Sequence, residues 1–455
     1  MHGVLSPGSN AFIMTEPVRI GVVGLGTVGS GVMRLLSSSA DHIARHAGRR
    51  IVVERAVVAN PAKNRGLDFP AERISNDIGS ISRDPSISVA VLLVGGLEPA
   101  RSMAIELLES GKDLVTANKA LLAEHGPELF ALARRRGRAI AFEAAVAGGI
   151  PIVAAIGECL AANRIESIRG ILNGTSNFIL TRMEEDGLDY ADALALAQAK
   201  GFAEADPSMD VDGTDATQKL AILAHLAFGV WVPWKEIPRV GVDTLDIGLL
   251  NDAAELGYRV RLVAVATREG GVLSMRVSPA LVRVGTPLAE TRGAFNAVSI
   301  VGDAVGPMFF HGLGAGQMPT ASAVVADIID TVVGRAAITF RTTGVLSEDN
   351  PDLTLGGDTQ ERHFLRISVR DRPGVLAAIT GILGDHGISI SSMLQRAGSG
   401  ATDEAVSLVI MTHRSPSVAM AAAVQTIDSL PTALAKSVCL TVLDQSRLDD
   451  ASPAA

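Results

Sequence analysis

A glycine-rich turn near the start of the chain most strongly limits how the chain can fold. The apolar residues 18–23 predict a strand. Gly24, Gly26 and Gly29 follow it at once, in the spacing G-x-G-x-x-G, and a helical stretch begins there. The first glycine permits a tight turn, the second lets backbone approach a pyrophosphate, and the third allows close helix–strand packing. A plain glycine turn without a ligand is the alternative. The motif predicts a doubly wound, Rossmann-type α/β domain with cofactor contacts from Gly24, Gly26, Thr27, Val28 and Gly29.

The residues after the second predicted strand, 51–59, bear on which dinucleotide binds. An enzyme that uses NAD usually has an acidic residue there for the ribose hydroxyls. This chain has Asn60 instead, and Lys63 and Arg65 follow. Cations in place of an acid suit a 2′-phosphate, although they are also common as ordinary loop charges. The pattern favours NADP and leaves NAD possible.

Two further strands end in residues suited to a ligand site. The run 88–94 ends in Gly95 and Gly96, which would let the nicotinamide or its ribose approach closely. The run 113–119 ends in Lys119, and Thr116 precedes it as another candidate cofactor contact. Strand carboxyl ends are where ligands sit in open α/β sheets, so both ends are candidate parts of the cofactor site. As a lone lysine, Lys119 would otherwise be a surface charge.

Composition limits the classes of function. At 455 residues the chain is long enough for two or three domains, and its net charge of −9 offers no basic patch for nucleic acid. No apolar run reaches the roughly 18 residues needed to span a bilayer. Cys159 and Cys439 lie far apart, which fits a reducing compartment. We expect a cytoplasmic protein that acts on small molecules.

An acidic stretch, residues 201–219, is the strongest candidate for chemistry. It holds five carboxylates and then Lys219, at the start of an apolar run. Asp215 and Lys219 fall four residues apart on a predicted helix and therefore share a face. A partly buried lysine beside a carboxylate can exchange protons, whereas the simpler alternative is a solvated acidic loop followed by a structural ion pair. The carboxylates are Glu204, Asp206, Asp210, Asp212 and Asp215.

Changes in the order of predicted strands and helices indicate where one domain ends and the next begins. The run 138–147 predicts a further strand, residues 173–177 a backbone turn, and Thr214 the cap of a helix. The glycine-rich residues 312–316 open a long apolar helix, which suggests that the chain returns to its first domain. The final part alternates as βαββαβ, a small ferredoxin-like sheet with helices on one face. The expected domains are a disordered leader (1–16), a nucleotide domain (17–150 and about 305–343), an α+β substrate and dimerisation domain (151–304), a linker (344–361) and the βαββαβ domain (362–445).

The order of these motifs resembles that of homoserine dehydrogenase. The nucleotide loop, Asn118-Lys119, Asn173-Gly174-Thr175 and the acidic stretch occur in the family's order over nearly all of residues 18–443. The final domain resembles an ACT domain through residues 371–376 and 387–390. The resemblance implies reduction of L-aspartate 4-semialdehyde to L-homoserine by NAD(P)H, in a homodimer or homotetramer. It also implies threonine as the effector of the ACT domain, although such a domain can serve only to pair subunits.

The resemblance also assigns residues. Lys219 corresponds to the proton donor and Lys119 to a second lysine near the reacting oxygen, with Asp215 in the same pocket. Glu204 corresponds to the group that binds the substrate ammonium, joined by Asp210, Gly174 and Thr175; Gly316 corresponds to a late nucleotide contact. A monovalent cation such as sodium is implied at carbonyls of Glu143, Val146, Gly148 and Ile150, and an effector site at Asp371, Gly374, Val375 and Ile388.

Some alternatives stay open. Leu92 stands where an acidic residue often precedes the paired glycines, which leaves the nicotinamide contacts unsettled. The carboxylates favour a substrate that bears an ammonium group but do not fix its length, so a reductase of another amino-acid semialdehyde is one rival. A catalytically silent amino-acid sensor is the other, and both lysines and the whole acidic loop argue against it.

Overall fold

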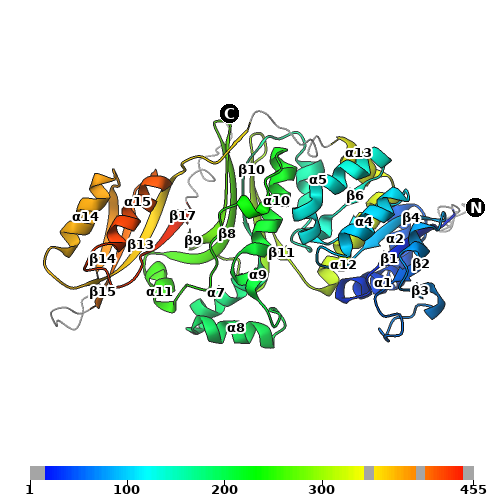
Figure 1. The fold of residues 1–455 in the computed structure, drawn as a ribbon, viewed down its shortest axis with the longest axis horizontal. Coiled ribbons are helices and arrows are strands. Elements are labelled where there is room, and N and C mark those ends of the chain that lie inside the picture. The colour runs from blue at the N-terminus through cyan, green and yellow to red at the C-terminus, as the bar shows by residue number, and fades with distance from the viewer. Residues whose placement is uncertain (1–15, 343–352, 396–404, 444–455) are drawn as a thin grey trace, which may run out of the picture. The chain divides into compact units, whose positions relative to one another are not determined.

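The structure is a computed structural model that describes residues 16–342, 353–395 and 405–443 (Figure 1). Nearly all of the expected leader, the first part of the expected linker and the end of the chain lie outside the described residues. The chain forms two compact units. Unit 1 comprises Met1–Arg164, Gln218–Glu236 and Gly312–Asn350, and unit 2 comprises Ile165–Thr217, Ile237–His311 and Pro351–Ala455.

Unit 1 is built on a six-stranded sheet with the strand order β3-β2-β1-β4-β5-β6. Every pair in it is parallel, and the apolar runs of β1 and β4 are buried because helices cover the sheet. The order reverses direction between β1 and β4, which is where such sheets bind ligands. The strands are β1 (Val18–Val23), β2 (Ile51–Val57), β3 (Ile74–Ser75), β4 (Ile87–Leu92), β5 (Asp113–Thr116) and β6 (Ile140–Ala141).

The helix that opens after residues 312–316 packs within this unit. Apolar side chains of α12 share one core with β1, β2, β4 and α1. The expected Rossmann-type sheet is therefore confirmed, with a late segment of the chain in its core. The helices of unit 1 are α1 (Thr27–Ser38), α2 (Ala40–Ala47), α3 (Gly79–Ser82), α4 (Ala100–Glu109), α5 (Lys119–Arg136), α6 (Ile152–Ala154), α12 (Gln317–Val332), α13 (Arg335–Thr342) and most of α10 (Thr214–Phe228).

Unit 2 contains an eleven-stranded mixed sheet, of which nine strands follow the order β11-β10-β7-β8-β9-β17-β13-β15-β14. β12 pairs with β9, and β16 pairs with β13. The strands are β7 (Ile165–Ile171), β8 (Tyr258–Glu269), β9 (Val272–Arg283), β10 (Phe295–Gly302), β11 (Gly306–Leu313), β12 (Thr354–Leu355), β13 (Gln360–Arg370), β14 (Ile390–Gln395), β15 (Ala405–Thr412), β16 (Ser415–Pro416) and β17 (Val438–Leu443).

The predicted βαββαβ domain is present and continues the larger sheet. Its order is β13, α14, β14, β15, α15 and β17, and its core is separate from that of the other strands. β17 pairs in parallel with β9, through partners such as Val442 and Leu281. The sequence did not predict this pairing, because it joins strands far apart along the chain. The helices of unit 2 are α7 (Gly174–Asp186), α8 (Tyr190–Ala199), α9 (Ser208–Val211), α11 (Ile247–Glu255), α14 (Val375–Asp385) and α15 (Ser417–Asp428).

Three local predictions were wrong. The strand expected over 138–147 is only Ile140–Ala141, and a turn of 3-10 helix, Glu143–Ala145, replaces its second half. Asn173 to Asn177 is the start of helix α7 rather than a turn, because the Asn173 side chain accepts a hydrogen bond from the Ser176 N–H. Thr214 is a helical residue rather than a cap, and its own N–H donates to the Asp212 carboxylate.

Burial makes one histidine of α10 sensitive to acid. His225 is 5% exposed, stacks on Phe130 and meets Trp231 edge-on. Burial, with a smaller contribution from the nearby Arg134, lowers the pKa of His225 from 6.5 to about 4. Between these two pH values the unfolded chain binds the proton and the folded chain does not, so stability is lost as the pH falls from 6.5 towards 4.

Between pH 6.5 and pH 4, protonation of His225 should lower the free energy of unfolding by about 3 kcal/mol. The thermal midpoint of the wild type should therefore fall more steeply between pH 7 and pH 4.5 than that of His225→Gln. His413→Gln, at an exposed position, is the control and should follow the wild type. Parallel pH profiles of the wild type and His225→Gln would contradict the assignment.

Candidate functional site

The glycine turn after β1 has the geometry that a pyrophosphate needs. Gly24 has a φ of +97°, and a Cβ there would lie 2.9 Å from the Leu93 carbonyl oxygen. A Cβ on Gly29 would lie 2.0 Å from the Gly24 carbonyl oxygen, so only glycine permits this packing of α1 on the turn. α1 begins at Thr27 without a side-chain cap, which leaves backbone N–H groups at its first turn for an anion.

A cavity of about 400 Å³ adjoins this turn within unit 1. Gly24, Gly26, Lys63 and Arg65 are among the residues that line it. Arg65 donates to the backbone carbonyls of Lys63 and Asn60, at 2.6 and 2.9 Å, which fixes the loop after β2. The structure thus brings the two predicted cations to the same cavity as the glycine turn.

Asn118 organises the carboxyl ends of β4 and β5. Its side-chain amide donates to the carbonyls of Val94 and Gly96, at 2.9 and 2.7 Å, and its oxygen caps α5 by accepting from the Leu121 N–H. The hydroxyl of the fully buried Thr116 donates to the Leu92 carbonyl, at 2.9 Å. Lys119 is the first residue of α5 and is half-buried. This role of Asn118 was not predicted, because a helix cap that also ties two strand ends has the same local sequence as any other cap.

Gly316 lies next to the nucleotide turn. It precedes α12 with a φ of +118°, a conformation that favours glycine. The next residue, Gln317, donates to the Thr27 carbonyl at 3.0 Å. The late glycine loop is thereby held against the first turn of α1.

The segment 143–150 is a compact backbone loop. The Glu143 carboxylate accepts from the N–H groups of Val153 and Ala154, at 2.9 and 2.8 Å, and burial raises its pKa. The Gly149 N–H donates to the Leu313 carbonyl at 2.9 Å, and a Cβ on Gly148 would lie 2.9 Å from Thr320 Oγ1. The Glu143 backbone carbonyl accepts from the Val146 N–H, at 3.4 Å, and the Ile150 carbonyl accepts from the Ile152 N–H, at 2.8 Å.

In unit 2, Asn173 brings two predicted acidic residues together. Its amide nitrogen lies 2.8 Å from Asp210 Oδ1 and 2.8 Å from Asp215 Oδ2. Asn173 is 4% exposed, Asp215 is 5% exposed and Asp210 is half-buried, so the amide joins one buried carboxylate to one that water still reaches. The Ser176 hydroxyl donates to the Asp210 carbonyl, which fixes α9 beside α7.

The other predicted substrate residues also belong to unit 2. The Thr175 hydroxyl donates to the Phe202 carbonyl at 2.6 Å, and a Cβ on Gly174 would lie 2.7 Å from the Ala294 carbonyl oxygen. Glu204 is exposed, on the segment between α8 and α9. Gly174 and Thr175 thus contact the backbone of neighbouring segments, whereas the Glu204 side chain is accessible to a solute.

Helix α10 carries Asp215 and Lys219 one turn apart. Asp215 is 5% exposed and Lys219 is 8% exposed, as expected from the apolar run that follows the lysine. Buried lysines and aspartates are seldom tolerated unless paired or engaged with another polar group. Their burial excludes solvated positions for these two side chains and leaves a reactive site and a structural ion pair as the alternatives.

Of the four residues expected to bind an effector in the βαββαβ domain, three line one cavity and the fourth does not. A cavity of about 320 Å³ is lined by residues that include Asp371, Gly374 and Val375. Gly374 precedes α14 with a φ of +89° and no side-chain cap. Ile388 does not line this cavity, because it is 4% exposed and packs in the core of the segment.

Family models match three parts of the chain. The model for homoserine dehydrogenase, NAD binding domain, matches residues 24–143, and the model for homoserine dehydrogenase matches residues 151–329. The ACT domain model matches residues 363–428. In the described part of the chain, no helix combines the length and apolarity needed to cross a membrane.

Relatives match over most of the chain. It is 43% identical to a homoserine dehydrogenase of Pseudomonas aeruginosa, over 88% of this chain and 92% of the relative. It is 36% identical to that of Bacillus subtilis, over 91% and 96%. The crystal structure of a homoserine dehydrogenase from Thiobacillus denitrificans matches with a TM-score of 0.88 and 40% identity, over 94% and 99%.

A more distant solved structure bears on the cofactor. It is a hyperthermophilic archaeal homoserine dehydrogenase mutant in complex with NADPH, with a TM-score of 0.58 and 27% identity, over 69% of this chain and 97% of that chain. The glycine turn and its cavity agree with a nicotinamide nucleotide as the cofactor. The chain belongs to the homoserine dehydrogenase family of NAD(P)-dependent oxidoreductases.

Proposed function

We propose that the chain reduces L-aspartate 4-semialdehyde to L-homoserine with NADPH, and catalyses the reverse reaction. Family membership and the buried Asp215 and Lys219 of α10 support this proposal, and the burial of these two charged residues is the observation that carries it. The bound nucleotide supplies the hydride. The chain's own residues must then protonate the carbonyl oxygen, stabilise the negative charge that develops there, and hold the amino-acid part of the substrate.

The proposal gives each group one task. Lys219 donates the proton, and Lys119 adds a second positive charge that stabilises the developing alkoxide. Glu204 binds the substrate ammonium, since its carboxylate is exposed. Asp210 and Asp215, tied by Asn173, set the negative potential around the ammonium and the proton donor. Gly174 and Thr175 contribute backbone beside the substrate.

The reaction is tested by following NADPH oxidation with L-aspartate 4-semialdehyde and the purified full chain. We expect saturable turnover, and none of comparable kcat/KM with glutamate 5-semialdehyde, which is one methylene longer. A preference for the longer substrate would move the assignment to another semialdehyde. A folded protein without turnover in NADPH or NADH would contradict the proposal and favour a silent sensor.

We expect Lys63 and Arg65 to select NADPH. Both line the cavity beside the glycine turn, and a 2′-phosphate there would accept charge-assisted hydrogen bonds from them. Each such bond contributes about 1.5 kcal/mol or more, so Lys63→Ala/Arg65→Ala should raise the KM for NADPH about tenfold or more. The KM for NADH should change little, because NADH has no 2′-phosphate.

The control for that double variant is Arg49→Ala, which removes an exposed positive charge that does not line the cavity. Its KM for NADPH should stay within about twofold of the wild type, since exposed charges away from the ligand contribute little. Equal increases in KM for NADPH and NADH in the double variant would show that these residues act on the loop as a whole and would overturn the NADP assignment.

The loop 143–150 is proposed to bind a monovalent cation such as sodium. The compact backbone of this loop and the engagement of the Glu143 carboxylate support a site made of carbonyl oxygens. Thermal midpoints at constant ionic strength should be higher in sodium chloride than in tetramethylammonium chloride, whose cation is too large for such a loop. Identical midpoints would count against the site.

The ACT-like segment is proposed to mediate inhibition by threonine. The cavity at residues 371–376 and the uncapped N-terminus of α14 support binding of an amino-acid carboxylate. Threonine titrated into the assay should inhibit at millimolar levels or below, and Asp371→Ala should weaken inhibition. Asp385→Ala, at the exposed far end of α14, is the control. No effect of threonine would leave this segment a structural part of the enzyme.

A further inference from the structure

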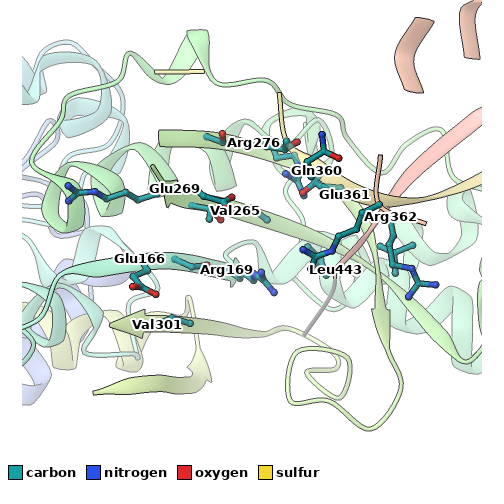
Figure 2. Close-up of a pocket in the computed structure, with 17 residues that line it drawn as sticks. Glu166, Arg169, Val265, Glu269, Arg276, Val301, Gln360, Glu361, Arg362 and Leu443 are labelled. Atoms are coloured by element: carbon teal, nitrogen blue, oxygen red, sulfur yellow. The ribbon is translucent and has the colours of Figure 1, made fainter. Parts of the chain in front are cut away.

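A second charged cavity lies in unit 2, on one face of the mixed sheet (Figure 2). Its volume is about 160 Å³, well above the roughly 15 Å³ that holds one water molecule. Its lining comes from β7 to β10 and from β13 and β17, so it spans the seam where β17 pairs with β9. It shares no lining residue with the cavity at residues 371–376.

One row of this face presents hydroxyl groups. Ser167 pairs with Thr267, and Thr267 pairs with Ser274, so the three side chains stand side by side on the same face of β7, β8 and β9. All three line the cavity. Ser167 is 8% exposed, and its Oγ has no hydrogen-bond partner in the described part of the chain. Buried hydroxyls are nearly always satisfied, so this one indicates a missing partner.

The next row presents guanidinium groups. Arg169 pairs with Val265, and Val265 pairs with Arg276, so the two arginines flank a small apolar residue, with backbones roughly 10 Å apart. Arg276 lies 2.7 Å from a carboxylate oxygen of Glu361, yet its Nε is buried without a hydrogen-bond partner among the described residues. Arg276 Nε therefore has no acceptor among the described residues, even though the same guanidinium is paired with Glu361.

Charge identifies the class of ligand. Arg268, Arg362 and Arg414 also line the cavity, against three glutamates in all, which leaves an excess of two positive charges. Figure 2 shows Arg169, Arg276 and Arg362 as sticks, from β7, β9 and β13 respectively. Arginine forks and hydroxyl groups together match the oxygens of a phosphate or carboxylate.

We propose that this cavity binds a compact dianion, either a phosphate or a small dicarboxylate, at the seam between the two parts of the sheet. The ligand would join arginines of β7 and β9 to Arg362, on β13, and to Arg414, which lies among the residues that the ACT domain model matches. Binding would thus stiffen the pairing of β9 with β17. This site is independent of the reaction proposed above and of the threonine site.

The proposal is tested by isothermal titration of inorganic phosphate, and separately of malonate, into the full chain. Saturating NADPH keeps the nucleotide site occupied, and chloride holds the ionic strength constant. We expect saturable binding of at least one of the two anions, which also identifies the source. Arg276→Gln should weaken it at least tenfold. Arg283→Gln, which removes an exposed arginine at the end of the same strand, should leave it unchanged.

Two further arms keep the test decisive. Ser167→Ala keeps every charge and should weaken binding by several-fold. It replaces Arg276→Gln as the test if loss of the Arg276–Glu361 pair unfolds the protein. Absence of saturable binding of either anion overturns the proposal, as do equal affinities in Arg276→Gln, Ser167→Ala and Arg283→Gln. A change in sedimentation mass without any anion binding would show that a second copy of the chain covers the cavity, and would also overturn it.

Discussion

Lys219→Ala is expected to lower kcat for the reduction of L-aspartate 4-semialdehyde by about 10²- to 10⁴-fold, the usual contribution of a positioned proton donor. Lys219 is buried on α10 one turn after Asp215, so water cannot readily take its place. KM should change much less, because the proton is transferred only as the hydride arrives. Stopped-flow or steady-state NADPH oxidation measures both quantities.

Two companion variants separate the roles. Lys219→Arg keeps the positive charge but cannot release a proton, so its kcat should stay close to that of the alanine variant. Glu204→Leu should mainly raise KM, since the exposed carboxylate is proposed to bind the substrate ammonium. Lys200→Ala, at an exposed lysine just after α8, is the matched control and should retain wild-type kinetics. A folded Lys219→Ala enzyme with kcat within threefold of the wild type would remove Lys219 from the mechanism.

Glu184→Gln is expected to lower the free energy of unfolding by about 3–5 kcal/mol, because it leaves a buried guanidinium uncompensated. Arg261, on β8, is 0% exposed and lies 3.0 Å from Glu184 Oε1. Burial lowers the pKa of Arg261, and Glu184 is the main group that opposes this effect. Chemical denaturation of the full chain, followed by far-ultraviolet circular dichroism, should show the loss.

The neighbouring residue supplies the control. Glu185 makes ion pairs with Arg182 and Arg292 at the surface, so Glu185→Gln should cost less than about 1 kcal/mol. Replacing both buried partners, in Glu184→Leu/Arg261→Met, should recover much of the stability, because no buried charge is then left alone. Equal costs for Glu184→Gln and Glu185→Gln would show that Arg261 finds compensation elsewhere.

Local patterns predicted the elements and the class of fold. The glycine turn, the apolar strands of unit 1 and the βαββαβ order each depend on residues close together in sequence, and each appears in the structure. The pairing of β9 with β17 could not be predicted in this way, because it joins residues near 281 to residues near 442. Long-range pairing depends on which edges remain free after each part folds, and short-range periodicity does not contain that information.

In the candidate site too, some residues could be predicted from the local sequence and others could not. The carboxylates, both lysines and the glycine turn could be found because charge clusters and glycine spacing stand out in a sequence. Asn118 and Asn173 could not, because an asparagine that ties two strand ends or two carboxylates has the same local sequence as a helix cap. Arg261 was missed for a related reason: an arginine within an alternating strand gives no sign that it is buried.

The pairing of β9 with β17 has a consequence for truncated forms of the enzyme. Ala280, Leu281 and Val282 of β9 are almost fully buried, and β17 covers their hydrogen-bonding edge. A chain that ends before β13 would expose this apolar edge to solvent, and such an edge readily pairs with the edge of another chain. We therefore expect the βαββαβ domain to keep the edge of β9 from pairing with another chain, whether or not it also binds an effector.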